Sequence, residues 1–425
     1  MNDMNNMNDS IVVIGGGHAA VQLCSGLAAA GLGAQVHLVC EEAELPYHRP
    51  PLSKAYLKNP AETLQPLRSA AWYAEAGITV YLADAAVAIN TTTRSVRLHS
   101  GRELAYTQLV LATGTRARRL PHLPYNLANV ATLHSAADAQ RLRTLLGTLL
   151  DTGQPLTVLG GGFIGLEIAA TARALGATVT VLESAPRLLM RSVSPELSEH
   201  VLHTHRASGI TIHLSVSVGH FEVADNRLAR LTVDGQPHPV GLLVLGIGAV
   251  PEHTLASAAG LVCNNGIVVD GCMRTSHPHI LAIGDCTSFP ETHSGRRLRL
   301  ESVQNANDQA RTAVTTLTTP TGNATPYTSL PWFWSEQGAL RLQMAGLIPH
   351  PPYHAEAAEQ ATRHRRPGAT PASFSVLHYL GDKLVCVESV NAPLDHMAAR
   401  KLLETAKSPA LALACDPATP LKNLL

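Results

Sequence analysis

The sequence predicts an α/β chain made of two parallel-sheet units, followed by an α+β region. Two runs predict the units, "SIVVIGGGHAAVQLCSGLAAAG" and "LTVLGGGFIGLEIAATARALGATVTVLE". Each passes from a β-branched apolar stretch through a glycine-rich turn into an alanine-rich amphipathic stretch. The third observation is "SFSVLHYLGDKLVCVESVN", two strand patterns that precede the helix pattern "DHMAARKLLETA". At 425 residues the chain is too long for one ordinary core, so we expect two to four domains.

Composition excludes several classes of partner. The 32 basic and 32 acidic side chains balance, so nothing draws the chain globally to nucleic acid or an anionic membrane surface. No apolar run approaches the roughly 20 residues that span a bilayer. The polar start, "MNDMNNMNDS", shows no secretory pattern, and we expect a short disordered lead-in there. The sequence predicts a globular cytoplasmic protein with no nucleic-acid or membrane partner.

Cysteine and histidine usage indicates neither a dithiol nor a metal site. The seven cysteines are scattered, and none are spaced as Cys-x-x-Cys, which fits free thiols in a reducing compartment. The 21 histidines come closest together in "HTH" and "HPH", with no cysteine or carboxylate at metal-ligand spacing nearby. We expect no metal.

The first unit contains a dinucleotide fingerprint. A strand at residues 11–14 leads into Gly15-x-Gly17-x-x-Ala20 and a helix. Gly15 permits the tight turn, Gly17 lets the backbone approach a pyrophosphate, and Ala20 keeps the helix close to the strand. The helix then points its free N–H groups at phosphate. Glu41 ends the next strand, 26 residues after Gly15, where a carboxylate can take ribose hydroxyls.

The second unit repeats the fingerprint at Gly160, Gly162 and Gly165. Glu183 ends the following strand, 23 residues after Gly160. A carboxylate there accepts a hydrogen bond from a free 2′-hydroxyl and repels a 2′-phosphate, so NADH is favoured over NADPH. Arg187, four residues further on, leaves some use of NADPH open.

Two further strands break into turns, at Thr113-Gly114 in "LVLATGTRARRLP" and at Gly284-Asp285 in "RTSHPHILAIGDC". In this order around two fingerprints, the set resembles the flavoprotein disulfide reductase superfamily with two dinucleotide-binding domains. The resemblance implies that the first unit binds FAD, with Asp285 on the ribityl chain. It implies that the second unit binds NAD(P)H and is inserted into the first.

The segment "EEAELPYHRPPLSKAYL" separates this chain from the thiol-using branches of that superfamily. Those branches carry redox-active cysteine here, whereas this segment contains none after Cys40. Cys40 lies in the strand that positions Glu41, so we interpret it as a packed core thiol. The flavin is therefore expected to pass electrons directly to an external acceptor.

The runs "PYHRPPLSK", "LRSAAWYAEAGI", "ESVQNANDQAR", "LPWFWSEQGALRLQMAGL" and "VESVNAPLDHMAARKLL" closely resemble the NADH-dependent ferredoxin reductases. These are the putidaredoxin reductase type and the reductase components of ring-hydroxylating dioxygenases. The resemblance covers residues 10–425. It implies an NADH:ferredoxin oxidoreductase that takes a hydride from NADH. Its FAD would release electrons singly to an acidic [2Fe–2S] ferredoxin serving a cytochrome P-450 or a dioxygenase.

The resemblance also implies the site residues. Those expected to contact FAD are Gly15, Gly17, His18, Ala19, Ala20, Glu41, Arg49, Lys54, Val87, Ala112, Thr113, Gly114, His134, Gly284, Asp285, Ser302, Val303 and Trp334. Those expected to contact NAD are Gly160, Gly162, Phe163, Ile164, Gly165, Glu183, Arg191, Gly246 and Gly248.

Four residues are expected to act in catalysis: Lys54, Glu167, Glu301 and Trp334. On the resemblance, Lys54 pairs with Glu167 near the flavin, where a buried cation stabilises reduced, anionic flavin. From the residues alone, Lys54 could instead be exposed after the Pro-Pro turn. Glu167, placed in the first helical turn, could serve only the helix dipole.

The few aromatic residues are unevenly distributed along the sequence. Aromatics make up only 4% of the chain, yet Trp332, Phe333 and Trp334 are adjacent. We interpret Trp332 as packing at a domain interface, and the resemblance implies that Trp334 shields the flavin edge. His134 stands where the resembling proteins often have arginine, so FAD affinity is lower or is carried by Arg49 and Arg116.

Arginines form three clusters that could face an acidic ferredoxin: Arg116, Arg118 and Arg119; Arg296, Arg297 and Arg299; Arg363, Arg365 and Arg366. The alternative is solvated charge on loops. The segment "IPHPPYHAEAAEQATRHRRPGATP" looks long and basic for the family.

The predicted domains are residues 1–120 with 252–330 for FAD, 121–251 for NAD, and an α+β domain at 331–425. A monomer and a homodimer both stay open. So do two other functions, an NADH-dependent reductase of rubredoxin or a small acceptor, and a redox-sensing flavoprotein like apoptosis-inducing factor.

Overall fold

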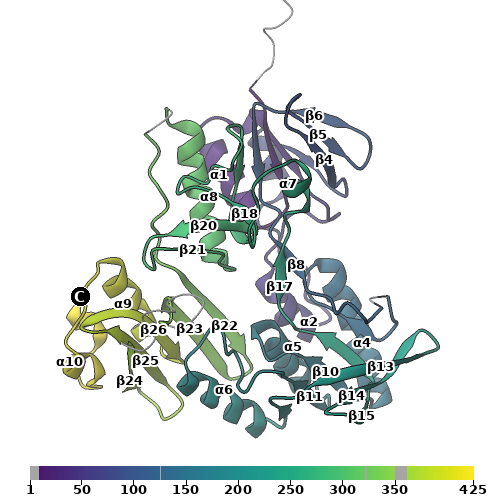
Figure 1. Cartoon of the computed structure of the whole chain (residues 1–425), viewed down its shortest axis with the longest axis vertical. Coiled ribbons are helices and arrows are strands. Elements are labelled where there is room, and N and C mark those ends of the chain that lie inside the picture. The colour runs from purple at the N-terminus through teal and green to yellow at the C-terminus, as the bar shows by residue number, and fades with distance from the viewer. Residues whose placement is uncertain (1–8, 125, 321–322, 350–360) are drawn as a thin grey trace, which may run out of the picture. The chain divides into compact units, whose positions relative to one another are not determined.

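The structure is a computed structural model that describes residues 9–124, 126–320, 323–349 and 361–425. It divides into two compact units (Figure 1). Unit 1 takes the described parts of 1–49, 64–116 and 250–329, and unit 2 takes those of 50–63, 117–249 and 330–425. The predicted N-terminal lead-in and part of the long basic segment before "ASFSV" lie outside the described residues.

The core of unit 1 is a five-stranded parallel sheet in the order β19-β7-β1-β2-β3. Its strands are β1 (Ile11–Ile14), β2 (Val36–Val39), β3 (Thr79–Tyr81), β7 (Gln108–Leu111) and β19 (Ile280–Ala282). All four residues of β1 are buried, and β1 pairs in register with β2 on one side and β7 on the other. Burial on both faces explains why β1 reads as a continuous β-branched run.

Helices α1 (His18–Ala29) and α8 (Val303–Thr318) pack closely together in unit 1. A Cβ added at Gly26 would lie 2.5 Å from Cγ2 of Val314, so glycine is required at this contact. Ser302 caps α8 by accepting from the backbone N–H of Asn305 at 3.0 Å.

Smaller elements complete unit 1. They are α3 (Ala70–Glu75), β4 (Ala86–Asn90), β5 (Ser95–Leu98), β6 (Glu103–Ala105), α7 (Thr254–Ala258), β18 (Ile267–Val268), η3 (Gly284–Cys286), β20 (Thr287–Glu291) and β21 (Arg296–Leu298). The chain passes between the units within β8 (Thr115–Ala117) and β17 (Ala249–Pro251).

Unit 2 contains a second five-stranded parallel sheet, in the order β12-β11-β10-β16-β9. Its strands are β9 (Val130–Ala131), β10 (Leu156–Leu159), β11 (Val179–Leu182), β12 (Thr211–His213) and β16 (Leu242–Leu245). The helices are α4 (Ala136–Thr152), α5 (Phe163–Ala174) and α6 (Pro195–Ala207). A hairpin sheet of β13 (Val218–Ala224), β14 (Arg227–Val233) and β15 (Gln236–Pro239) lies between β12 and β16 in the chain.

The C-terminal region has the predicted α+β architecture. Its antiparallel sheet has the order β22-β23-β26-β25-β24. The strands are β22 (Trp332–Gln337), β23 (Leu340–Gly346), β24 (Ala361–Pro367), β25 (Phe374–Leu380) and β26 (Lys383–Val390). They are followed by α9 (Pro393–Glu404), α10 (Leu411–Cys415) and η5 (Leu421–Leu424).

One apolar cluster joins the two sheets of unit 2. Val158 and Val181 of the parallel sheet belong to the same buried cluster as Leu342 and Phe374 of the antiparallel sheet. This shared core explains why both sheets fall into one compact unit. The division of the chain into three functional domains stays a prediction.

The segment 50–63, predicted as part of the FAD domain, folds onto unit 2 as η2 (Pro50–Ser53) and α2 (Ala55–Lys58). Thr171 of α5 donates to the carbonyl of Ser53 at 2.8 Å. Arg143 of α4 donates to the carbonyls of Tyr56 and Pro60, and its guanidinium lies 3.7 Å from the centroid of the Tyr56 ring. The segment is therefore anchored by helices that follow it in the chain.

All seven cysteines are free, and four of them are buried: Cys24, Cys40, Cys286 and Cys386. Among the described residues, no three His, Cys, Asp or Glu side chains form a group that could hold a metal ion. None of the described helices is both long and apolar enough to cross a membrane.

Candidate functional site

The first glycine turn has the geometry of a phosphate cradle. Gly15 has φ +126°, and a Cβ there would lie 2.2 Å from the carbonyl oxygen of Ala112, so only glycine fits. Gly17 is the N-cap of α1, with no described side chain capping the helix and no atom within 4 Å of an added Cβ. His18, Ala19 and Ala20 open α1, whose N–H groups are thus left for an anionic ligand.

A second feature of unit 1 fits FAD. Asp285 lies in η3 directly after β19, and its buried Oδ1 has no hydrogen-bond partner in the described part of the chain. Burial, reinforced by the charge of Glu301 and opposed by Arg299, raises the pKa of Asp285 to about 7. An orphaned buried acceptor needs a donor, and a sugar hydroxyl of the ribityl chain is a suitable one. The residues present therefore fit the cofactor.

The other residues predicted for FAD in unit 1 come from several further segments of the chain. Thr113 follows Ala112 and donates to the carbonyl of Glu252 at 2.5 Å, and Gly114 has φ +66°. Ser302 and Val303 are the N-cap and first residue of α8. Glu41 is exposed beyond the end of β2. Val87 is exposed on β4.

Three arginines of unit 1 that were singled out in the sequence pair with glutamates. Arg49 contacts Glu42 at 2.7 Å, and Glu42 also accepts from the hydroxyl of Tyr47 at 2.6 Å. Glu42 was not predicted, although the adjacent acids at the strand end gave the signal. Glu301 contacts Arg299 at 2.5 Å, and Arg116 contacts Glu252 at 3.1 Å.

The second glycine turn has the same geometry as the first. Gly160 has φ +108°, and an added Cβ would lie 2.4 Å from the carbonyl oxygen of Gly246. A Cβ at Gly165 would lie 2.4 Å from the carbonyl oxygen of Gly160, so this glycine lets α5 approach the turn. Gly162 is the N-cap of α5 without a described side-chain cap, and the helix opens with Phe163 and the exposed Ile164.

Glu183 is held rigidly at the end of β11. Its carboxylate accepts from the backbone N–H of Gly161 at 2.6 Å and of Ala185 at 2.7 Å. Arg187 donates instead to the carbonyls of Val193 and Met190, at 2.7 and 2.8 Å. Its guanidinium is thus engaged in closing its own loop. Arg191 lies at Gly248, where an added Cβ would be 3.6 Å from Nη2.

The predicted pair of Lys54 and Glu167 is present in unit 2. Nζ of Lys54 lies 2.6 Å from Oε2 of Glu167, and the side chains are 21% and 4% exposed. Ser53 donates to the same oxygen at 2.5 Å, and Ser335 donates to Oε1 at 2.7 Å. The interpretation of Lys54 as an exposed side chain is therefore wrong.

One detail of that prediction needs correction. Glu167 is the fifth residue of α5, which has no acidic residue in its first turn. The dipole effect is confined to the first turn, so it does not account for this acid. Hydrogen bonds from Lys54, Ser53 and Ser335 account for the buried carboxylate instead.

The aromatic run is divided between the two faces of β22. Residues i and i+2 of a strand share a face, and the rings of Trp332 and Trp334 stack with centroids 5.8 Å apart. Trp332 also packs on α9, 5.9 Å from His396 and 4.1 Å from the guanidinium of Arg400. Trp332 was expected to seal a domain interface, whereas these contacts lie within the C-terminal region. The two tryptophans form one stack.

Phe333 lies on the opposite face of β22. Its ring meets that of Phe163 edge to face at 5.0 Å, which joins β22 to the start of α5. This contact is typical of aromatic pairs in cores. Phe333 has no predicted role, and the alternation of side chains along the strand was the available signal.

The residues predicted for FAD do not all lie in one unit. Lys54, His134 and Trp334 belong to unit 2, and the others to unit 1. His134 precedes Ser135, the N-cap of α4, and its backbone N–H donates to Asp138 of the capping box at 3.0 Å.

The third arginine cluster is not solvated charge on a loop. Arg363, Arg365 and Arg366 all lie in β24. Arg366 is 4% exposed and donates to Asp395, whereas Arg363 pairs with Glu196 at 3.0 Å. Arg365 lies over the ring of Phe374 at 4.0 Å. Strand alternation sends these neighbouring charges to different surroundings.

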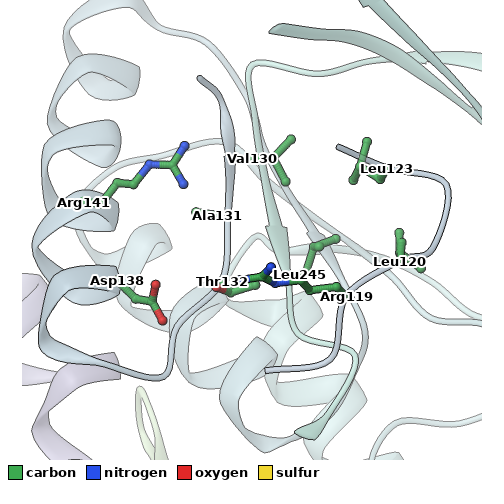
Figure 2. A pocket seen from close by; sticks show the side chains of 9 residues that line it. All are labelled: Arg119, Leu120, Leu123, Val130, Ala131, Thr132, Asp138, Arg141 and Leu245. Atoms are coloured by element: carbon green, nitrogen blue, oxygen red, sulfur yellow. The ribbon is translucent and has the colours of Figure 1, made fainter. Parts of the chain in front are cut away.

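A pocket of about 180 Å³ in unit 2 is lined by none of the residues predicted for FAD or NAD, although Asp138 in its lining accepts from the backbone N–H of His134 (Figure 2). It is lined by Arg119, Leu120, Leu123, Val130, Ala131, Thr132, Asp138, Arg141 and Leu245. Asp138 caps α4 and Arg141 donates to the carbonyl of Leu127 at 2.7 Å, so both are engaged in holding the chain. The pocket contributes no residue to the candidate site.

Comparison with known proteins agrees with this geometry. Residues 9–310 match the pyridine nucleotide-disulphide oxidoreductase family, and residues 332–425 match the reductase C-terminal family. The chain is 41% identical to rhodocoxin reductase of Rhodococcus erythropolis, over 93% of this chain and 90% of that protein. It is 37% identical to putidaredoxin reductase of Pseudomonas putida, over 99% and 97%.

Solved structures of ferredoxin reductases are also similar to this chain. A ferredoxin reductase from Rhodopseudomonas palustris superposes with a TM-score of 0.89 at 38% identity, over 98% of this chain and 99% of that one. The reductase in a covalent putidaredoxin reductase–putidaredoxin complex also reaches 0.89, at 36% identity over 99% and 98%. The cofactors of this chain are FAD and NAD(H). The chain thus belongs to the pyridine nucleotide-disulphide oxidoreductase family and, within it, to the ferredoxin reductases.

Proposed function

We propose that this chain is an NADH:ferredoxin oxidoreductase. The observation that carries the proposal is the presence of two glycine turns, each opening onto an uncapped helix N-terminus. One turn belongs to the unit that holds the orphaned acceptor of Asp285, and the other is followed by the fixed carboxylate of Glu183. One chain can therefore hold two different dinucleotides at once.

The chain's residues have distinct tasks on this proposal. The N–H groups at the start of α1 bind the FAD pyrophosphate, and Asp285 accepts from the ribityl chain. The start of α5 and Glu183 bind NADH. Lys54 supplies a positive charge that favours reduced flavin, Glu167 holds Lys54, and Trp334 is the aromatic residue that the proposal assigns to the flavin. Bound FAD supplies the chemistry that turns one hydride into two single electrons.

The acceptor is a [2Fe–2S] ferredoxin with an acidic face, bound transiently. The names of the similar proteins support this class, because rhodocoxin and putidaredoxin reductases are among them. The first two arginine clusters, at residues 116–119 and 296–299, offer net positive charge for such a partner, although Arg116 pairs with Glu252 and Arg299 with Glu301. We further propose that the reductase works in the cytoplasm, since all seven cysteines are free. A cytochrome P-450 or a dioxygenase would consume the electrons.

The test is NADH oxidation by the FAD-loaded protein with and without a [2Fe–2S] ferredoxin. We expect turnover to require the ferredoxin and to fall as salt rises from low to physiological ionic strength, because small electron-transfer contacts are electrostatically steered. Fast NADH oxidation without any protein acceptor would instead indicate a reductase of small acceptors. Turnover with rubredoxin alone would point to the rubredoxin branch, which also has a relative 34% identical to this chain. Slow flavin reduction with a redox-dependent change in molecular size would indicate a sensor.

A further inference from the structure

A line of buried polar side chains continues from the Lys54–Glu167 pair into the interior of unit 2. Ser335 and Gln337 of β22 are both 1% exposed, and His205 of α6 is 2% exposed. Glu336, between the first two, is exposed, so strand alternation sends Ser335 and Gln337 to the buried face together. Polar groups this deeply buried destabilise the fold unless each finds a partner.

The chemistry of each group fixes the direction of every hydrogen bond in this line. An ionised carboxylate only accepts, so Ser335 Oγ donates its one proton to Glu167 Oε1 at 2.7 Å. Ser335 Oγ must then accept from Gln337 Nε2, at 3.1 Å. The Gln337 amide is thereby oriented with Oε1 toward His205, whose Nε2 lies 2.8 Å away and must carry the proton.

All the hydrogen bonds therefore point the same way, from His205 to Glu167. Burial lowers the pKa of His205, so at neutral pH the imidazole is uncharged and the Nε2–H tautomer serves as the donor. Three elements that are distant in the chain, α6, β22 and α5, meet in this line.

The end of the line sets the position of a charge. Without the Ser335 donor, the Glu167 carboxylate can rotate about its terminal torsion, which has a broad, roughly two-fold profile. Its other oxygen holds Nζ of Lys54 at 2.6 Å and the hydroxyl of Ser53 at 2.5 Å. Any rotation is therefore transmitted to the ammonium group.

We propose that Ser335, Gln337 and His205 are positioning residues that lock the Glu167 carboxylate and so fix the ammonium group of Lys54, the cation that the proposed function assigns to reduced flavin. The inference rests on the proposed function, because it takes Lys54 to act on bound flavin. It adds residues from β22 and α6 that act on Lys54 through Glu167.

The experiment uses FAD-loaded protein and matched variants. Gln337→Met removes both amide hydrogen bonds at similar volume. His205→Met removes the donor at the far end, whereas His205→Gln keeps an N–H group that can reach the same oxygen. Glu336→Gln is the control on the exposed face of the same strand. Anaerobic rapid mixing with NADH gives the limiting rate of flavin reduction and the apparent Kd, and reductive titration gives the flavin midpoint potential.

We expect Gln337→Met and His205→Met to lower the limiting rate by about tenfold or more, with the Kd for NADH within about twofold of the parent. Both should shift the midpoint potential to more negative values, as Lys54→Met does, because the cation no longer stabilises reduced flavin. His205→Gln and Glu336→Gln should match the parent. Adding Gln337→Met to Lys54→Met should change the potential no further, since the line acts through Lys54.

Two results would overturn the proposal. One is a parental rate and potential in folded Gln337→Met and His205→Met. The other is a His205→Gln variant as impaired as His205→Met, which would show that packing matters and the hydrogen bond does not. If NADH fails to reduce the parent, the proposed function fails, while the potentials, measured with dithionite, still decide whether the line positions Lys54.

Discussion

At the residue scale, we propose that the carboxylate of Glu183 sets the preference for NADH over NADPH. Two backbone N–H groups hold it at the end of β11, directly beside the glycine turn. Such a fixed anion accepts from a free 2′-hydroxyl and repels a 2′-phosphate. Arg187, which the sequence left as a possible NADPH contact, is bound to the carbonyls of Val193 and Met190. The structure therefore supports discrimination against NADPH.

Replacing Glu183 by Ala should reduce the preference for NADH over NADPH by about tenfold, mainly by raising KM for NADH. It should not create an NADPH enzyme, because Arg187 stays engaged in its loop. The measurement is kcat/KM with each nucleotide, and Glu199→Ala, on an exposed position of α6, is the control. An unchanged ratio would refute the assigned role.

Asp285 gives a pH-dependent prediction. Its pKa is raised to about 7, well above the ordinary value near 4 for an aspartate, so between these values the folded chain holds a proton that the unfolded chain has released. The stability due to this group is thus fully present at acid pH and is lost as pH rises through about 4 to 7. FAD-free Asp285→Asn should have a higher Tm than the parent at pH 8, and the gap should shrink toward pH 5.

Thermal unfolding of the FAD-free protein at several pH values checks this expectation. Asp382→Asn, at an exposed turn before β26, should show no such trend. The Asp285→Asn protein should also retain FAD more weakly, because its amide is a poorer acceptor than a carboxylate. A Tm difference that does not vary with pH would contradict the raised pKa.

At the scale of an element, β24 shows how a strand sorts neighbouring charges. Arg366 is 4% exposed and donates to the carboxylate of Asp395 at 3.1 Å. It also donates to the carbonyls of Ala414, Asp416 and Thr419, at 2.9, 2.6 and 3.0 Å. It therefore ties the end of the chain to the sheet.

Arg366→Met should lower the free energy of unfolding by about 3–5 kcal/mol, because it leaves Asp395 and several carbonyls without their donor. Arg363→Ala, which removes a half-exposed pair with Glu196, should cost less than about 1 kcal/mol. Urea unfolding followed by circular dichroism compares them. Equal losses of unfolding free energy in the two variants would contradict the structural role assigned to Arg366.

At the scale of the whole molecule, the proposed electron path avoids thiols. Burial, together with the charge of Glu42, raises the pKa of Cys40 to about 12, so its thiol stays protonated. Cys40 follows the end of β2, and a Cβ added at Gly16 would lie 3.2 Å from its Sγ. This thiol fills space behind the glycine turn.

Cys40→Ala should therefore keep NADH-dependent ferredoxin reduction within about twofold of the parent. It should lower stability by about 1 kcal/mol, through the small cavity that it leaves. Steady-state turnover and thermal unfolding test the two parts separately. A loss of turnover in a folded, FAD-loaded variant would show that electrons pass through the thiol.

The sequence by itself determined the two nucleotide turns and the order of the elements around them. Positive-φ glycines, buried parallel strands and helix starts are local features, so the strand at 11–14 could be predicted to the residue. The α+β architecture of the C-terminal region could likewise be predicted, because its strands and helix have the matching local hydrophobic periodicity. Local chemistry also located Asp285 and Glu183 at strand ends.

Only the tertiary structure decided which distant side chains meet. Nothing in the spacing joins His205 to Gln337 or assigns segment 50–63 to helices α4 and α5. Nor does composition tell Arg366 from Arg363, because burial depends on which face of β24 each occupies and on what packs there. These contacts arise from long-range packing, which a local pattern cannot encode, and they set the environment of the Lys54–Glu167 pair.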